Sequence, residues 1–125
     1  MISNQLNALT LARLSANNTT ILTPISKLLI GVLNVLQKNE YINRYEIIND
    51  LRGGFIKAEI GEKFNECREI RPHYFVKNKD IIKYEKRYLP AYNYGILIIS
   101  TSKGLITHRE ALEKGYGGAL IAYAY

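Results

Sequence analysis

Three hydroxyl groups, an ammonium group and a glycine are adjacent in the run 100–104, Ser100-Thr101-Ser102-Lys103-Gly104. Hydroxyls and the backbone amides beside a glycine can bond phosphate or ribose oxygens, and Lys103 adds a positive charge. The run directly follows the apolar residues 96–99, so we expect it at the end of a buried strand. It is therefore the first candidate for binding an anionic ligand.

A loop that binds nucleotides for hydrolysis would need glycines that this run lacks. Its usual pattern has one glycine directly before the lysine and another five residues earlier. Those positions here hold Ser102 and Leu97. A small nucleotide-dependent enzyme is thus disfavoured, whereas an ordinary polar turn stays an open alternative for the run taken alone.

Other residue types that carry catalysis or bind metals stand isolated in this sequence. The triplet 108–110, His-Arg-Glu, has no second polar group placed to orient the imidazole. Cys67 could have its pKa lowered by Arg68, but without a positioned histidine it is interpreted as a small core residue. One Cys and two His match no metal-binding spacing. We therefore predict a protein that is not an enzyme, with no metal and no cofactor.

Positive charge is concentrated in the second part of the chain. The 125 residues include 17 Lys+Arg and 11 Asp+Glu, a net charge of +6. Residues 1–63 hold seven basic and five acidic residues (+2), and residues 64–125 hold ten and six (+4). Basic residues cluster with aromatic ones at Arg68, Arg71, His73, Tyr74, Phe75, Lys77, Lys79, Lys83, Tyr84, Lys86, Arg87 and Tyr88. This mixture suits a folded RNA, and a solvated basic face fits it equally well.

The first 63 residues have the pattern of an N-terminal α-β-α-β-β lobe. We expect a helix in 1–15, a short strand at 19–22 and two strands of a hairpin at 44–48 and 55–60. Between them, Thr23 is the expected N-cap and Pro24 the first-turn residue of a helix. Its apolar positions recur at helical spacing: Ile25, Leu28, Leu29, Val32, Leu33 and Leu36.

Residues 64–125 are expected to form a C-terminal lobe that is mainly β with a short helix. Strands are predicted at 71–76, 94–100 and 119–125, and 79–88 is predicted as a short charged helix or turn region. Thr107 and Glu110 form a capping-box pattern for a two-turn helix that Gly115 ends. Both lobes together predict an α/β (α+β) fold. No apolar run reaches the roughly 20 residues of a membrane helix, so no membrane partner is expected.

Residues 98–111, Ile-Ile-Ser-Thr-Ser-Lys-Gly-Leu-Ile-Thr-His-Arg-Glu-Ala, followed by Gly117-Gly118, resemble the C-terminal signature of a known family. It is the family of the eighth protein of the small ribosomal subunit. The run 24–27, Pro-Ile-Ser-Lys, also resembles that family's entry into its apolar helix, and the order of the elements agrees. The resemblance therefore extends over essentially the whole chain.

The resemblance implies a two-lobed structural protein that binds the central domain of small-subunit rRNA directly and supports subunit assembly and translation. Neighbouring small-subunit proteins would be its other partners, and no small-molecule substrate is implied. Carried over residue by residue, the expected RNA-binding positions are Ser100, Thr101, Ser102, Lys103, Gly104 and Thr107, with Ser26, Lys27 and Arg13 in the first lobe. Gly117 and Gly118 would shape the adjacent turn.

The segment 65–90 departs from the bacterial pattern of this family. The spacing Asn65-x-Cys67-x-x-Ile70-x-Pro72 looks more like the archaeal and eukaryotic branch. Together with a composition rich in residues that have A/T-rich codons, this mixture leads us to expect a divergent mitochondrial copy on the ribosome, with a plastid or bacterial origin as alternatives. A free-standing regulatory RNA-binding module is the alternative function.

Overall fold

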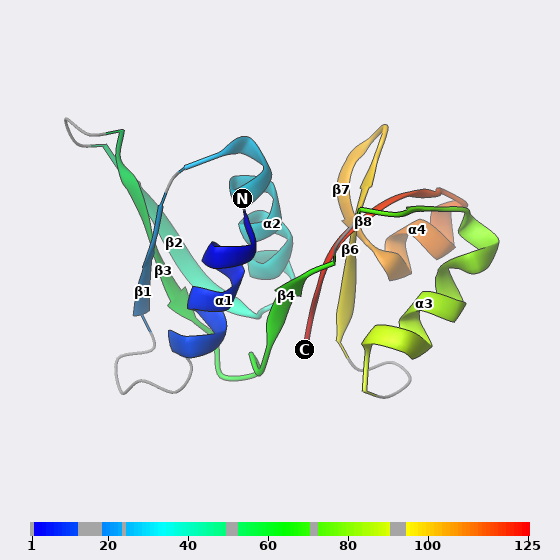
Figure 1. The fold of residues 1–125 in the computed structure, drawn as a ribbon, viewed down its shortest axis with the longest axis horizontal. Helices are drawn as coiled ribbons and strands as arrows, with labels where there is room; N and C mark the ends of the chain where they lie inside the picture. The colour runs from blue at the N-terminus through cyan, green and yellow to red at the C-terminus, as the bar shows by residue number, and fades with distance from the viewer. Residues whose placement is uncertain (1, 13–18, 24, 50–52, 71–72, 91–94) are drawn as a thin grey trace. The chain divides into compact units, whose positions relative to one another are not determined.

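The computed structural model describes residues 2–12, 19–23, 25–49, 53–70, 73–90 and 95–125. Two compact units divide the chain, Met1–Arg68 and Glu69–Tyr125. Helices and antiparallel sheets occur in both parts of the chain, which confirms the predicted α+β class (Figure 1). Among the helices described, none is long and apolar enough to cross a membrane.

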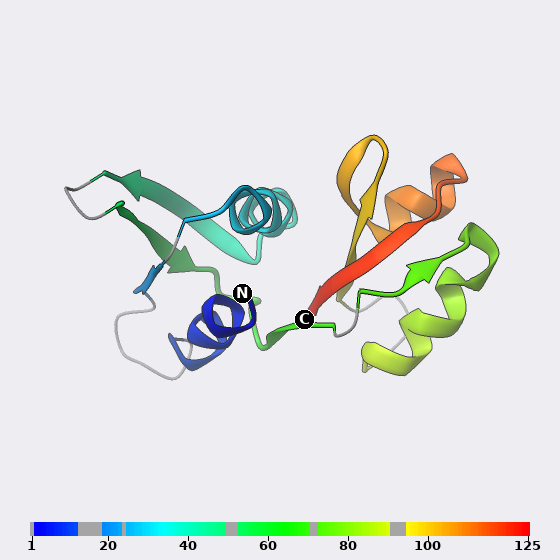
Figure 2. The same ribbon diagram turned by 45° about the horizontal axis from the view of Figure 1, so that its top comes forward.

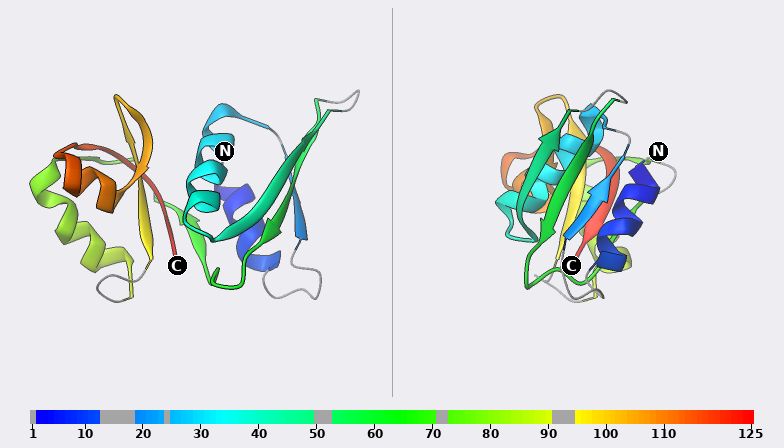
Figure 3. Two further views of the ribbon diagram at one scale, coloured as in Figure 1. Left: turned by 180° about the vertical axis from the view of Figure 1, so that it is seen from behind. Right: turned by 90° about the vertical axis from the view of Figure 1, so that its left-hand side faces the viewer.

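The first unit has the predicted α-β-α-β-β order. It contains α1 (Ile2–Ala12), β1 (Thr19–Leu22), α2 (Lys27–Lys38), β2 (Ile42–Ile48) and β3 (Phe55–Ile60). The three strands form an antiparallel sheet in the order β1-β3-β2, with β3 in the centre (Figure 3). The hairpin expected from the two strand patterns is therefore confirmed.

The core of this unit follows from the alternation along β3. Ile56, Ala58 and Ile60 are buried, whereas Lys57 between them is exposed, as expected for a strand with one solvated face. Both helices contribute fully buried leucines, among them Leu6, Leu9, Leu29, Leu33 and Leu36. Burying a leucine side chain of this kind stabilises the folded state by about 1.5–3 kcal/mol before entropy is counted.

Helix α2 begins three residues later than the sequence pattern predicted. Ser26 is its N-cap, with an extended backbone (φ −143°, ψ 159°) and a hydroxyl that accepts the Leu29 N–H at 3.1 Å. Thr23 is exposed and lies outside the helix. Thr23 as N-cap is thus wrong, because Ser26 supplies the same capping chemistry one turn nearer to the buried leucines; Pro24 lies outside the described residues.

The second unit is built on a sheet with the strand order β4-β8-β6-β7. β4 (Cys67–Glu69) crosses the boundary between the units, and β5 (Phe75–Val76) pairs with β8 (Gly118–Ala124) (Figure 2). β6 (Ile96–Thr101) pairs antiparallel with both β7 (Gly104–Thr107) and β8. The remaining elements are a 3-10 turn, η1 (Asn78–Asp80), and the helices α3 (Ile81–Tyr88) and α4 (His108–Lys114).

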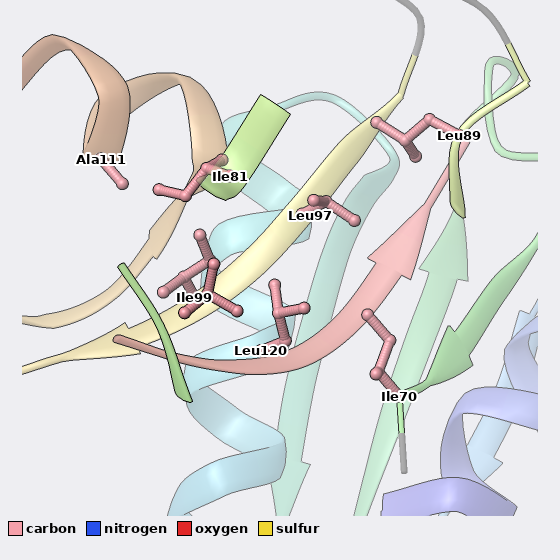
Figure 4. Packing of buried hydrophobic residues seen from close by; sticks show 8 residues of the cluster. Ile70, Ile81, Leu89, Leu97, Ile99, Ala111 and Leu120 are labelled. Atoms are coloured by element: carbon pink, nitrogen blue, oxygen red, sulfur yellow. The ribbon is translucent and has the colours of Figure 1, made fainter. Parts of the chain in front are cut away.

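Helices α3 and α4 cover one face of this sheet. Ile81 of α3 and Ala111 of α4 are fully buried against Leu97 and Ile99 of β6 and Leu120 of β8 (Figure 4). Asn78 of η1 fixes the end of α4, because its Nδ2 donates to the carbonyls of Ala111 (2.7 Å) and Tyr116 (3.0 Å). The face of β6 that carries Leu97 and Ile99 therefore packs against α3 and α4, and Ile96 and Ile98 on its other face are buried as well.

Several predictions for this unit are confirmed and others are corrected. The charged segment 79–88 is helical over Ile81–Tyr88, Thr107 caps α4 with its hydroxyl, and Gly115 ends α4 at φ +77°. The strand predicted at 71–76 is present only at Phe75–Val76, and residues 71–72 lie outside the described residues. β4 and β7 were not predicted; β7 exists through its pairing with β6, which its own residues do not signal.

Candidate nucleic-acid interface

The run 100–104 forms the end of a β-hairpin, which we call the tip hairpin. Ser100 pairs with Leu105 and Thr101 with Gly104, so Ser102 and Lys103 are the two residues of the turn. Gly104 has φ +109°, a backbone conformation that favours glycine. The loop expected at this position is thus a tight turn that leaves Ser102 and Lys103 exposed.

The Thr101 hydroxyl closes this turn from within. It donates to the Gly104 carbonyl at 2.9 Å and accepts the Lys103 N–H at 3.1 Å. These two bonds hold the turn in one shape and leave the Ser102 hydroxyl and the Lys103 ammonium as its outward groups. Within the described residues, Lys103 has no ion pair. Its charge therefore remains open to an anionic partner.

Two glycines allow β8 to pass closely beside the tip hairpin. A Cβ atom on Gly118 would overlap the Ser100 carbonyl oxygen, and one on Gly117 would lie 2.7 Å from the Val76 carbonyl oxygen. Side chains at these two positions would push β8 away from β6 and β5. Gly118 thus allows the close approach of β8 to Ser100, where β6 enters the hairpin turn, and Gly117 allows the approach to β5.

Phe75 belongs to the basic and aromatic cluster seen in the sequence but not to the RNA-binding positions implied by the resemblance, and it lies near the tip hairpin. Its side chain is 76% exposed, an unusual state for a phenylalanine. Phe75 pairs with Ala119, and Ala119 pairs with Ser100, so the three residues form one row across β5, β8 and β6. Paired residues point to the same face of a sheet, and the backbones of Phe75 and Ser100 are about two strand spacings, or ~10 Å, apart.

Thr107 is the last residue of β7 and His108 the first residue of α4, and both are buried. Thr107 is 3% exposed, and its hydroxyl accepts the Glu110 N–H at 3.3 Å. His108 accepts the Leu97 N–H on Nδ1 at 3.0 Å, and its Nε2 lies 2.5 Å from Glu85 Oε2. Since a backbone N–H can only donate, Nδ1 carries no proton and Nε2–H donates to the Glu85 carboxylate.

Of the first-lobe positions implied by the resemblance, Ser26 and Lys27 lie together at the start of α2. Both are exposed, and the Ser26 hydroxyl is engaged as the helix cap. Lys27 is thus the group there that remains open to a ligand. Arg13 lies outside the described residues.

The structure argues against a reactive cysteine and against a metal site in the described residues. Burial, with a smaller contribution from Glu66, raises the pKa of the Cys67 thiol to about 12, so Arg68 does not activate it. Because only the thiolate is a nucleophile, this residue is unreactive in the folded chain. No group of His, Cys, Asp and Glu residues in the described ranges could hold a metal ion.

Comparison with known proteins agrees with the resemblance seen in the sequence. The family model described as "Ribosomal protein S8" matches residues 1–125. The small ribosomal subunit protein uS8 of Nanoarchaeum equitans (strain Kin4-M) is 44% identical over 125 residues, which is 100% of this chain and 97% of that protein.

This relative bears on the origin of the chain. It is archaeal, which agrees with the archaeal and eukaryotic pattern of residues 65–90 and gives no support to the mitochondrial origin inferred from composition. A ribosomal location is supported. With a match over its whole length and this degree of identity, the chain belongs to the ribosomal protein S8 family, whose members are structural components of the small ribosomal subunit and not enzymes.

Proposed function

We propose that this protein binds the central domain of small-subunit rRNA directly through the tip hairpin and thereby supports assembly of the subunit. The observation that carries the proposal is the turn itself. The internal bonds of Thr101 hold it rigid, while Ser102 and Lys103 remain exposed at its end. A turn shaped before binding loses little conformational entropy when an RNA contacts it.

The groups around the tip suit an irregular, partly unpaired RNA better than a regular duplex. Lys103 would neutralise a phosphate, and the Ser102 hydroxyl can both donate to and accept from a ribose or a base edge. Phe75, in the same row as Ser100, offers an aromatic face on which an unpaired base could stack. Stacking requires a base that has left its helix, so the expected target is an internal loop or bulge.

The positions implied by the resemblance fall into two groups: residues proposed to contact RNA and residues proposed to shape the binding surface. Ser102, Lys103 and the Ser100 hydroxyl are the proposed contacts in the second unit. Thr101, Gly104, Thr107, Gly117 and Gly118 are proposed to shape the surface, because their hydroxyls are engaged or their backbones pack closely. In the first unit Lys27 is the proposed contact, Ser26 its helix cap, and Arg13 a further proposed contact.

The experiment measures affinity of the purified chain for a transcript of the central domain, with transcripts of the 5′ and 3′ domains as competitors. Ser102→Ala and Lys103→Ala should each weaken binding by about 1–3 kcal/mol, because each leaves a desolvated RNA group unpaired. Lys114→Ala removes another exposed lysine, at the end of α4, and serves as the matched control.

Equal affinity of the parent and both tip variants would refute the proposal, provided that the circular dichroism and melting temperatures of all proteins agree. Equal affinity for all three rRNA domains would refute the assignment to the central domain. An equal loss of affinity in the tip variants and in Lys114→Ala would also refute the proposal, because net charge alone would then determine RNA binding.

A further inference from the structure

Helix α3 carries a strongly basic surface that the tip hairpin does not use. Within the second unit the exposed residues along η1 and α3 are all basic apart from Ile82, which is 50% exposed. We call this surface the α3 basic face; it consists of Lys79, Ile82, Lys83, Lys86 and Arg87. From Lys79 to Arg87 the helical rise amounts to about 12 Å.

No exposed acid balances these charges on the same helix. Asp80 is half-buried at the start of α3, and Glu85 is buried, with its carboxylate bonded to His108. None of the four basic side chains has an ion pair with another described residue. The α3 basic face therefore presents uncompensated positive charge to its surroundings.

The spacing of these residues costs the free protein some stability. Lys79 and Lys83 are four residues apart, as are Lys83 and Arg87, so like charges lie one helical turn from each other. Such pairs destabilise a helix, whereas opposite charges at the same spacing would stabilise it. A bound polyanion would remove this repulsion.

The α3 basic face and the side chains of Ser100 and Phe75 lie on opposite faces of the sheet of the second unit. α3 packs on the sheet through Ile81, which meets Ile99 in the core (Figure 4). Ser100 follows Ile99 in β6, so its side chain points to the other face, the one that Phe75 shares. An RNA segment that contacts Ser100 and stacks on Phe75 would therefore lie on the face of the sheet opposite α3.

We propose that the α3 basic face binds the phosphate backbone of a second RNA segment, so that this unit bridges two parts of the rRNA. The proposal rests on the proposed function, because the tip hairpin supplies the first RNA contact. Four cations within about 12 Å match the close spacing of phosphates along a duplex, and lysine acts on phosphate as a point charge without reading sequence. The binding at α3 is thus sequence-independent and strongly dependent on salt.

The test has two parts, both using the full chain. First, binding of a fluorescent RNA duplex of about 20 base pairs and unrelated sequence is measured in solution at several salt concentrations. Second, the protein is bound to an immobilised central-domain transcript, and the retention of added duplex is measured. The test variant is Lys83→Gln/Lys86→Gln/Arg87→Gln, and the control Lys38→Gln/Lys57→Gln/Lys114→Gln removes three exposed lysines from other elements.

The proposal predicts that the test variant lowers the slope of log K against log salt by about two to three, whereas the control leaves the slope nearly unchanged. The variant should still bind the central-domain transcript but should no longer retain duplex on it. Its melting temperature at low salt should equal or exceed that of the parent, because repulsion along α3 is relieved.

Duplex binding that is equal in the parent and the test variant overturns the proposal. Poly-L-glutamate that binds the parent more tightly than the duplex, and is lost in the test variant, would also overturn it and would indicate an acidic protein as the partner. Failure of the tip proposal is distinguishable: the immobilised transcript then retains no protein, while duplex binding in solution still depends on α3.

Discussion

Hydroxyl groups of similar chemistry around the tip hairpin have different roles because their surroundings differ. Thr101 bonds two backbone groups of the turn, and Thr107 is 3% exposed as the cap of α4. Ser102 is exposed at the end of the turn. The sequence pattern could place all three near a ligand, but only the hydrogen bonds show which hydroxyl is left to bind it.

Phe75 gives the first prediction at this scale. Phe75→Ala should leave the stability of the chain nearly unchanged, because the ring is 76% exposed and loses few contacts. Affinity for the central-domain transcript should fall by about 1–3 kcal/mol if a base stacks on this ring. Isothermal titration measures the loss. The variant Phe75→Tyr keeps the aromatic face and should bind like the parent; an alanine variant with parental affinity would contradict the stacking role.

The buried pair of His108 and Glu85 gives a second prediction, on stability against pH. Burial lowers the pKa of the His108 imidazole, Arg109 adds to this, and the hydrogen bond with Glu85 partly offsets it. In the unfolded chain the imidazole regains a pKa of about 6.5, so the unfolded state binds the proton first. The free energy of unfolding should therefore fall as the pH decreases below about 6.5, by at most about 1.4 kcal/mol per pH unit.

Urea unfolding between pH 7 and pH 5 measures this dependence. His108→Gln should be less stable at pH 7, because a buried hydrogen-bonded pair is broken, and should show a smaller slope with pH. Ser102→Ala, at an exposed position, removes no titratable group and should keep the parental slope. A parental slope in His108→Gln would contradict the assignment to this pair.

Among the elements, those signalled by local chemistry could be predicted and those that depend on distant partners could not. Thr107 as N-cap and Gly115 as the left-handed end of α4 follow from neighbouring residues, and both are present. β7 is four residues long and exists because β6 pairs with it, a fact that its own sequence does not carry. The row formed by Phe75, Ala119 and Ser100 depends on three strands far apart in the sequence.

The start of α2 shows how two local signals can compete. Thr23 and Ser26 both have side chains that cap helices, and a proline next to Thr23 strengthened that choice. The hydrogen bond from Leu29 N–H to Ser26 and the burial of Leu29 select the later start. The packing of Leu29 therefore selects Ser26 as the N-cap, although Thr23 has a side chain of the same capping chemistry.

A third prediction concerns the close approach of β8 to β6. Gly118→Ala should destabilise the chain by about 1–3 kcal/mol, because the added methyl group overlaps the Ser100 carbonyl oxygen and the strands must separate. Ala119→Gly changes the neighbouring residue without adding atoms and should cost about 1 kcal/mol or less. Chemical denaturation compares the two. A Gly118→Ala variant as stable as the parent would show that β8 can shift without cost.

At the scale of the whole molecule, the net charge of +6 did not indicate how its basic residues are divided between surfaces. The cluster in residues 68–87 was expected to form one RNA-binding region or a solvated face. In the structure α3 covers the face of the second unit's sheet opposite to Ser100 and Phe75, and the turn of the tip hairpin carries a single lysine. Composition predicted an anionic partner, whereas the fold separates two places where such a partner can bind.

The most direct test of the rRNA-binding claim is sedimentation of the tagged chain through a sucrose gradient at high salt. The parent protein should travel with the small ribosomal subunit, because its tip contacts do not depend on charge alone. Ser102→Ala/Lys103→Ala should dissociate to the top of the gradient at a salt concentration that leaves the parent bound, whereas Lys114→Ala should behave like the parent. Parent and tip variant remaining on the subunit to the same extent at every salt concentration would contradict the account.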